Sequence, residues 1–128
     1  MSNLLYDRLF GCHQGEEKPF LIFADGAQQS YDSFLRQTAR FANVIQAIGL
    51  EVGDRLAAQV EKSAEALALY AACVQSAVIF LPLNTAYTPA EVSYFVGDSG
   101  ANLVVADQNF DLEPVAREHG AALERLNA

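Results

Sequence analysis

Hydrophobic and polar positions along the chain follow two rhythms, one typical of helices and one typical of strands. Between residues 34 and 48, apolar side chains recur at steps of three and four, which predicts an amphipathic helix with one buried face. Shorter apolar runs at residues 55–60, 77–81 and 102–106 have the composition of buried strands. Polar turns or glycines separate these runs, so the chain is expected to form a series of short elements.

Local signals mark the starts of the expected helices. Ser30 or Asp32 is expected to cap the first long helix, and Ser63 is expected to cap the next. The strongest signal is at Thr88, which is followed by a proline and then, two residues later, by Glu91. This spacing predicts a capping box, in which each of the two side chains accepts a hydrogen bond from the backbone N–H of the other residue.

The first 31 residues predict a smaller unit, a short helix and a hairpin. Leucines near the start have helical spacing, and two strand-like runs at residues 19–24 and 28–31 flank the turn signal Asp25-Gly26. Residues 32–128 then alternate helix and strand, ending in a helix at about residues 112–119. This alternation predicts an α/β fold, with a mostly parallel sheet and helices on its faces.

Composition and charge narrow the classes of function. The chain has 128 residues, 52% of them hydrophobic, which suits one ordinary domain or a piece of a larger one. Its net charge is −8 with only two lysines, so no nucleic-acid partner and no anionic membrane surface is expected. The start of the chain has no secretory signal pattern, and the two cysteines form no framework, so reduced thiols in the cytoplasm are expected.

Motifs for phosphate, metal or nucleophilic chemistry are absent from the sequence. Neither the P-loop pattern, nor the dinucleotide glycine pattern, nor a nucleophile elbow occurs. Cys12-His13 is the only adjacent pair of good metal ligands, and no tetrahedral zinc spacing results. Cys73 is expected to be a small core residue, and His119 is expected to interact with a helix dipole. Residue types and spacing alone therefore leave the function undecided.

Several segments together resemble the start of adenylate-forming enzymes, the AMP-binding superfamily that includes acyl-CoA synthetases. They are Ser30-Tyr31 ahead of the amphipathic helix, the stretch GLEVGDRLA at residues 49–57, and residues 81–107 with their PLN turn, TPxE helix start and final aspartate. Two stretches, residues 58–67 and 81–88, are similar to malonyl-CoA synthetases in particular. One departure is Ser76-Ala77, where the family usually has Ala-Gly, so the turn from helix to strand is expected to differ there.

The resemblance implies that residues 1–128 are the N-terminal segment of the AMP-binding large domain, without the small C-terminal domain. The parent enzyme would be an acid–thiol ligase of fatty acid metabolism that uses ATP, Mg²⁺ and CoA. It would convert a small carboxylic acid, malonate or methylmalonate, into an acyl-adenylate and then into an acyl-CoA. Its catalytic, cofactor and metal residues are expected outside residues 1–128, so the piece alone is predicted to be inactive.

Two alternatives remain open, a broader short- or medium-chain acyl-CoA synthetase and a non-catalytic α/β scaffold module. The expected partner is the remainder of the enzyme chain, and the piece alone is expected to self-associate through unpaired strand edges. Asn84 and Thr85 are candidate wall residues of a substrate channel, because ligands in open α/β sheets gather beyond the carboxyl ends of strands. The competing interpretation is that these two residues only satisfy backbone groups in a turn.

Overall fold

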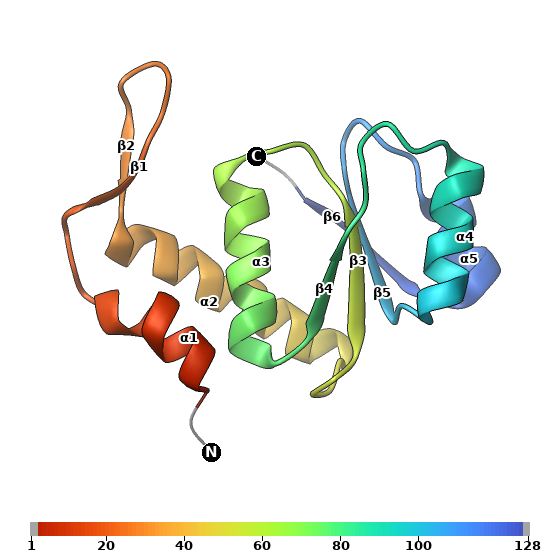
Figure 1. Ribbon diagram of the computed structural model, residues 1–128, viewed down its shortest axis with the longest axis horizontal. Helices are drawn as coiled ribbons and strands as arrows, with labels where there is room; N and C mark the ends of the chain where they lie inside the picture. Colours follow the sequence, from red (N-terminus) through yellow and green to blue (C-terminus); the bar gives the residue numbers. More distant parts are fainter. Residues whose placement is uncertain (1–2, 127–128) are drawn as a thin grey trace.

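The computed structural model describes residues 3–126, and its larger part is a parallel four-stranded sheet with helices on both faces (Figure 1). The strand order is β4-β3-β5-β6, and each neighbouring pair is parallel. The strands are β3 (Arg55–Gln59), β4 (Ile79–Pro82), β5 (Leu103–Asp107) and β6 (Ala122–Leu126). The predicted α/β fold is confirmed.

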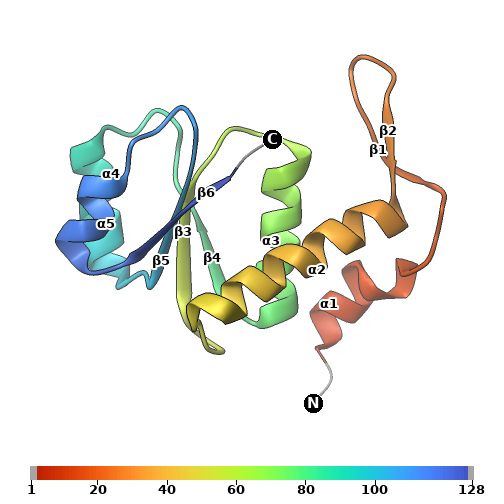
Figure 2. The same cartoon turned by 180° about the vertical axis from the view of Figure 1, so that it is seen from behind.

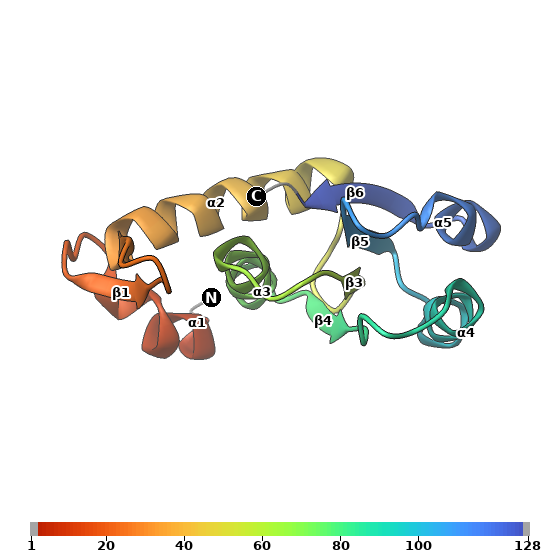
Figure 3. The same ribbon diagram turned by 90° about the horizontal axis from the view of Figure 1, so that it is seen from above.

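Helices cover both faces of the sheet, which gives three layers (Figure 3). Helices α2 (Tyr31–Ile48) and α3 (Ala64–Ser76) cover one face, and α4 (Pro89–Ser99) and α5 (Glu113–His119) cover the other. Because successive strand residues point to opposite faces, β3 and β5 must be apolar on both faces, and this explains their continuous hydrophobic runs.

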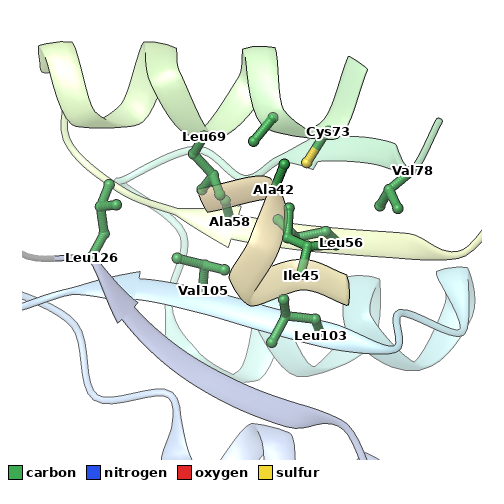
Figure 4. Close-up of a cluster of buried hydrophobic side chains, with 11 residues drawn as sticks. Ala42, Ile45, Leu56, Ala58, Leu69, Cys73, Val78, Leu103, Val105 and Leu126 are labelled. Carbon is green, nitrogen blue, oxygen red and sulfur yellow. The ribbon is translucent and has the colours of Figure 1, made fainter. Parts of the chain in front are cut away.

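The core between the sheet and helices α2 and α3 is made largely of aliphatic side chains (Figure 4). Leu56 on β3 and Leu103 on β5 belong to this cluster, and Ile45 of α2 lies beside them. Cys73 of α3 is completely buried in this cluster, which confirms its predicted place in the core. Burial raises the pKa of its thiol to about 12.

The N-terminal unit projects from one end of the molecule (Figures 1 and 2). Its elements are α1 (Leu4–Leu9), a 3₁₀ turn η1 (Gly11–His13), and the antiparallel strands β1 (Pro19–Ile22) and β2 (Gln28–Ser30). Phe10 packs against Phe34 of α2, with ring centroids 5.9 Å apart, and so anchors the unit to the main body. The predicted short helix and hairpin are confirmed.

The predicted helix starts are confirmed at the level of single hydrogen bonds. Of the two candidates for the first cap, Ser30 is the one used, and its side chain accepts a hydrogen bond from the Ser33 N–H at 3.1 Å. The capping box of α4 is complete, because Thr88 Oγ1 accepts from the Glu91 N–H at 3.2 Å and Glu91 Oε1 accepts from the Thr88 N–H at 3.0 Å.

Two expectations about strands are wrong. The expected strand at residues 77–81 begins later, at Ile79, because Ala77 takes a left-handed conformation (φ 56°, ψ 35°) that ends α3. The alternation does not end in a helix, since β6 follows α5 and adds a strand at the edge of the sheet. Its sequence ALERL mixes apolar and charged residues, which hides the strand pattern. Within residues 3–126, no helix has the length and apolar character needed to cross a bilayer.

Candidate functional site

The order in which strands are added to the sheet changes side at one point, between β3 and β5. After β3 the chain passes through α3 to β4 on one side, and after β5 it passes through α5 to β6 on the other side. Strands β3 and β5 are neighbours, and their following helices lie on opposite faces (Figure 3). Such a switch point opens a crevice at the carboxyl ends of the strands, where open α/β sheets bind ligands. This carboxyl edge is the candidate site.

The turn between β4 and α4 carries Asn84 and Thr85, and it lies at this edge as expected. Both residues are exposed. Asn84 Oδ1 accepts a hydrogen bond from the Ala86 N–H at 2.8 Å, and the Asn84 carbonyl accepts one from the Tyr87 N–H at 3.0 Å. The oxygens of Asn84 therefore shape the turn itself, while the role of Asn84 and Thr85 as channel walls stays a prediction.

The side chain of Gln59, the last residue of β3, connects this turn to the sheet. Its side chain is almost completely buried, at 1% exposure, and its Nε2 donates to the carbonyls of Asn84 at 3.1 Å and Tyr87 at 3.2 Å. The sequence places Gln59 in the expected strand at residues 55–60 and in the stretch 58–67 that resembles malonyl-CoA synthetases, and neither assigns a role to its side chain. The available signal was an amide inside an otherwise apolar strand, because a buried polar side chain needs partners from elsewhere in the fold.

Asp107, the last residue of β5, makes a second tie across the same edge. Its Oδ2 accepts a hydrogen bond from the Glu61 N–H at 2.7 Å, and its Oδ1 accepts one from the Asn109 N–H at 2.9 Å. The carboxylate thus joins the turn after β3 to the turn after β5. Charge-assisted hydrogen bonds of this kind are stronger than neutral ones. Gln59 and Asp107 together connect three turns at the carboxyl edge.

A shallow cavity of about 150 Å³ lies beside Asp107, between these turns. Its lining includes three carboxylates and the cap residue of α3; the full set is Glu61, Ser63, Glu65, Asp107, Gln108, Asn109 and Leu126. No lysine or arginine from residues 3–126 lines it. The Ser63 hydroxyl is engaged by the Ala66 N–H at 3.0 Å. Such an acidic rim repels a triphosphate, so this cavity does not fit the phosphates of ATP.

The other candidate residues for chemistry are used locally. Cys12 is exposed and donates to the Arg8 carbonyl, and His13 lies 3.0 Å from the Glu16 carboxylate, where hydrogen bonding lowers the pKa of Glu16. His119 is in the last turn of α5, as expected, and its Nε2 lies 2.9 Å from Ser93 Oγ on α4. Among residues 3–126, no group of three or more His, Cys, Asp or Glu side chains is arranged to hold a metal ion.

Comparison with known proteins identifies the family. The family model described as AMP-binding enzyme matches residues 11–127. The chain belongs to the AMP-binding enzyme family. A fatty acid–[acyl-carrier-protein] ligase, ScoC, from Streptomyces coeruleorubidus is 30% identical over 101 residues, or 79% of this chain and 19% of the relative. A feruloyl-CoA synthase from an Amycolatopsis species is 32% identical over 80 residues, or 62% of this chain and 16% of the relative.

Among solved structures, the apo form of MatB from Rhodopseudomonas palustris is 42% identical to this AMP-binding chain, with a TM-score of 0.90. The match covers 98% of this chain and 26% of the MatB chain. MatB has also been solved with ATP bound. This AMP-binding chain therefore spans about a fifth of the length of the curated relatives and about a quarter of MatB.

Proposed function

We propose that the chain forms the N-terminal part of an ATP-dependent acyl-CoA synthetase that activates malonate or methylmalonate. The observation that carries the proposal is the 42% identity to MatB, at a TM-score of 0.90 over 98% of the chain, together with the resemblance of two stretches to malonyl-CoA synthetases. The two stretches that resemble malonyl-CoA synthetases, residues 58–67 and 81–88, lie within that match and meet at the carboxyl edge through Gln59.

The proposed reaction has two half-reactions. In the first, a carboxylate oxygen of the acid attacks the α-phosphorus of ATP, and pyrophosphate leaves. In the second, the CoA thiol attacks the acyl carbonyl, and AMP leaves while the thiol proton passes to a base. The ATP-bound form of MatB supports ATP as the nucleotide, and Mg²⁺ and CoA belong to the same proposal.

The described residues contribute a scaffold to this reaction. The cavity at the carboxyl edge is acidic and does not fit a triphosphate, so the groups that would neutralise phosphate charge are proposed to lie in the rest of the enzyme. What this chain supplies is a set of turns, tied by Gln59 and Asp107, along one edge of the sheet. The remainder of the enzyme is thus its proposed partner.

A second candidate is a synthetase of broader acid range. It is favoured by the sequence relatives, which are named as ligases of fatty acids and of ferulate. These acids carry one carboxylate and a long or aromatic body, whereas malonate carries two carboxylates and almost no apolar surface. The two candidates therefore predict opposite orders of preference.

The test measures acyl-CoA formation by the enzyme that contains this chain. The enzyme is mixed with ATP, Mg²⁺, CoA and one acid at a time: malonate, methylmalonate, acetate, octanoate or ferulate. We expect the highest kcat/KM for one of the two dicarboxylates. A higher value for any of the other three acids favours the broader synthetase, and no acyl-CoA from any acid favours a non-catalytic scaffold.

The 128-residue chain alone is proposed to be inactive and prone to self-association. Strands β4 and β6 are the two edges of the sheet, and an apolar groove beside β4 exposes Leu4, Leu5 and Ile79 at 62%, 56% and 44%. The same acyl-CoA assay run on this chain is expected to show no product. Sedimentation velocity at increasing concentration is expected to show a rising mass, and a constant monomer mass would contradict self-association.

A further inference from the structure

We propose that Gln59 is a positioning residue that holds the β4–α4 turn, residues 83–88, as a fixed wall at the carboxyl edge and thereby sets the acid preference. This inference rests on the proposed function, because it assumes that the turn lies beside the carboxylic acid substrate. It goes beyond the family resemblance, since it concerns a side chain that lies under the turn and is shielded from solvent.

The amide of Gln59 matches the turn in number and geometry of hydrogen bonds. A primary amide has two N–H donors on one nitrogen, and Nε2 faces two carbonyl oxygens, those of Asn84 at 3.1 Å and Tyr87 at 3.2 Å. The neighbouring strand residues Leu56, Ala57 and Ala58 are buried and apolar. In those surroundings the buried amide of Gln59 needs partners, and the two turn carbonyls accept both of its N–H groups.

The hydrogen bonds inside the turn fix its shape, whereas those from Gln59 fix its position relative to the sheet. Bonds from the Ala86 and Tyr87 N–H groups to Asn84 close the turn and fix its shape. They do not fix where the turn lies, because all of their atoms belong to the turn. The two bonds from Gln59 connect it to the centre of the sheet, 25 and 28 residues earlier in the chain. The Leu83 N–H still donates to the Ala58 carbonyl at 2.8 Å and holds the start of the turn, so loss of Gln59 is expected to loosen residues 84–88 and to let the bonds inside the turn open more often.

The residues joined by this contact are the ones that mark the acid subtype. Gln59 lies in residues 58–67 and the turn lies in residues 81–88, the two stretches that resemble malonyl-CoA synthetases in particular. The two stretches that carry this resemblance are also hydrogen-bonded to each other, which favours a shared role in acid binding. A small dicarboxylate has few atoms that can contact its pocket, so its binding depends strongly on the position of each pocket wall.

The test compares three variants of the enzyme that contains this chain. Gln59→Met has a similar volume and no donor, and Gln59→Glu has the same shape with a carboxylate that repels the two carbonyls. Thr38→Val is the matched control, because Thr38 is completely buried and donates to the Phe34 carbonyl at 3.0 Å within α2, on the opposite face of the sheet. Each Gln59 variant removes two hydrogen bonds made by a buried side chain, Thr38→Val removes one, and only the Gln59 variants release the turn.

We expect both Gln59 variants to raise KM for the preferred acid by about 30-fold, the factor that corresponds to two hydrogen bonds of about 1 kcal/mol each. KM for ATP is expected to change by less than about twofold in every variant, since the bonds hold the acid-side turn. Amide hydrogen exchange at Ala86 and Tyr87 is expected to accelerate in the Gln59 variants and to stay unchanged in Thr38→Val. Parallel changes in both KM values, or Gln59 variants that behave like Thr38→Val, would overturn the proposal.

Failure of the proposed function gives a different pattern. The Gln59 comparison uses whichever acid the wild-type enzyme activates best, so a preference for octanoate or ferulate leaves the comparison intact. If the wild-type enzyme activates no acid, the proposed function fails and the role of Gln59 in acid preference fails with it. Hydrogen exchange at Ala86 and Tyr87 then still decides whether Gln59 holds the turn, and unchanged exchange would overturn that part too.

Discussion

Replacing Ala77 by glycine should stabilise the protein. Ala77 ends α3 in the left-handed region, at φ 56° and ψ 35°, and it is the only residue other than glycine with positive φ in residues 3–126. The Val78 N–H donates to the Cys73 carbonyl at 2.9 Å, and the Gly53 N–H donates to the Ala77 carbonyl at 2.9 Å. These bonds hold Ala77 in a conformation in which its Cβ crowds the backbone.

The expected gain is the difference between two terms. Left-handed backbone costs a residue with a Cβ about 1–2 kcal/mol, and glycine does not carry that cost. Glycine loses more freedom on folding, which offsets about 0.4–1 kcal/mol. Ala77 is exposed, so loss of its methyl group removes little buried surface. The net stabilisation should be about 1 kcal/mol.

Urea denaturation of the 128-residue chain measures this gain. With a slope of about 2 kcal/mol/M, Ala77→Gly should raise the midpoint by about 0.5 M. Gly100→Ala is the matched control, because Gly100 ends α4 at φ +67° and an added Cβ meets no heavy atom within 4 Å. It should lower the midpoint by a similar amount. A lower midpoint in Gly100→Ala with no rise in Ala77→Gly would refute the reasoning.

Two further predictions concern packing and the buried thiol. Gly97→Ala places a Cβ 2.6 Å from His119 Cε1, so it should displace the histidine ring and lower the free energy of unfolding, measured with urea, by about 1–2 kcal/mol. Most of this cost should vanish when the same substitution is made in a His119→Ala background. An equal cost in that background would contradict the contact. A thiol reagent at pH 8 should label Cys12 quickly and Cys73 only on unfolding. Because burial raises the pKa of Cys73 from 9.0 to about 12, its stabilising contribution should be complete below pH 9 and be lost as pH rises toward 12. The urea midpoint should fall across that window, and Cys73→Ala should remove this part of the fall.

Features that depend on neighbouring residues could be predicted from the sequence. The capping box at Thr88 and Glu91 is closed by two hydrogen bonds across three residues, so its residue types and spacing contain the whole motif. The left-handed residue at Gly49 and the hairpin turn at Gly26 have the same local character. The alternation of helices and strands could also be predicted, because the helices space their apolar residues three or four apart. The central strands are buried on both faces, so they appear in the sequence as short continuous apolar runs.

Features that depend on partners far along the chain could not be predicted. Strand β6 has the sequence ALERL, and it is a strand because β5 offers it an edge and not because its own pattern is strong. At Ala77 the residue type disfavours the left-handed conformation, and the bonds from Val78 and Gly53 impose it. In each place a distant partner, β5 for β6 and Gly53 for Ala77, works against the local preference.

The candidate site also combines a local feature that the sequence predicts with a long-range contact that it does not predict. Asn84 and Thr85 were visible as a turn beyond a strand, but the amide that holds the turn belongs to β3, and Gln59 reads in sequence as an ordinary strand position. Exposed turn residues can change without disturbing the sheet, whereas a change at Gln59 removes a donor from the Tyr87 carbonyl and leaves the Asn84 carbonyl with the Tyr87 N–H. The position of the wall therefore depends more on Gln59 than on the residues that form the wall. If acid preference is set at this edge, substitutions at residue 59 should alter it more than substitutions at Thr85, whose side chain is exposed.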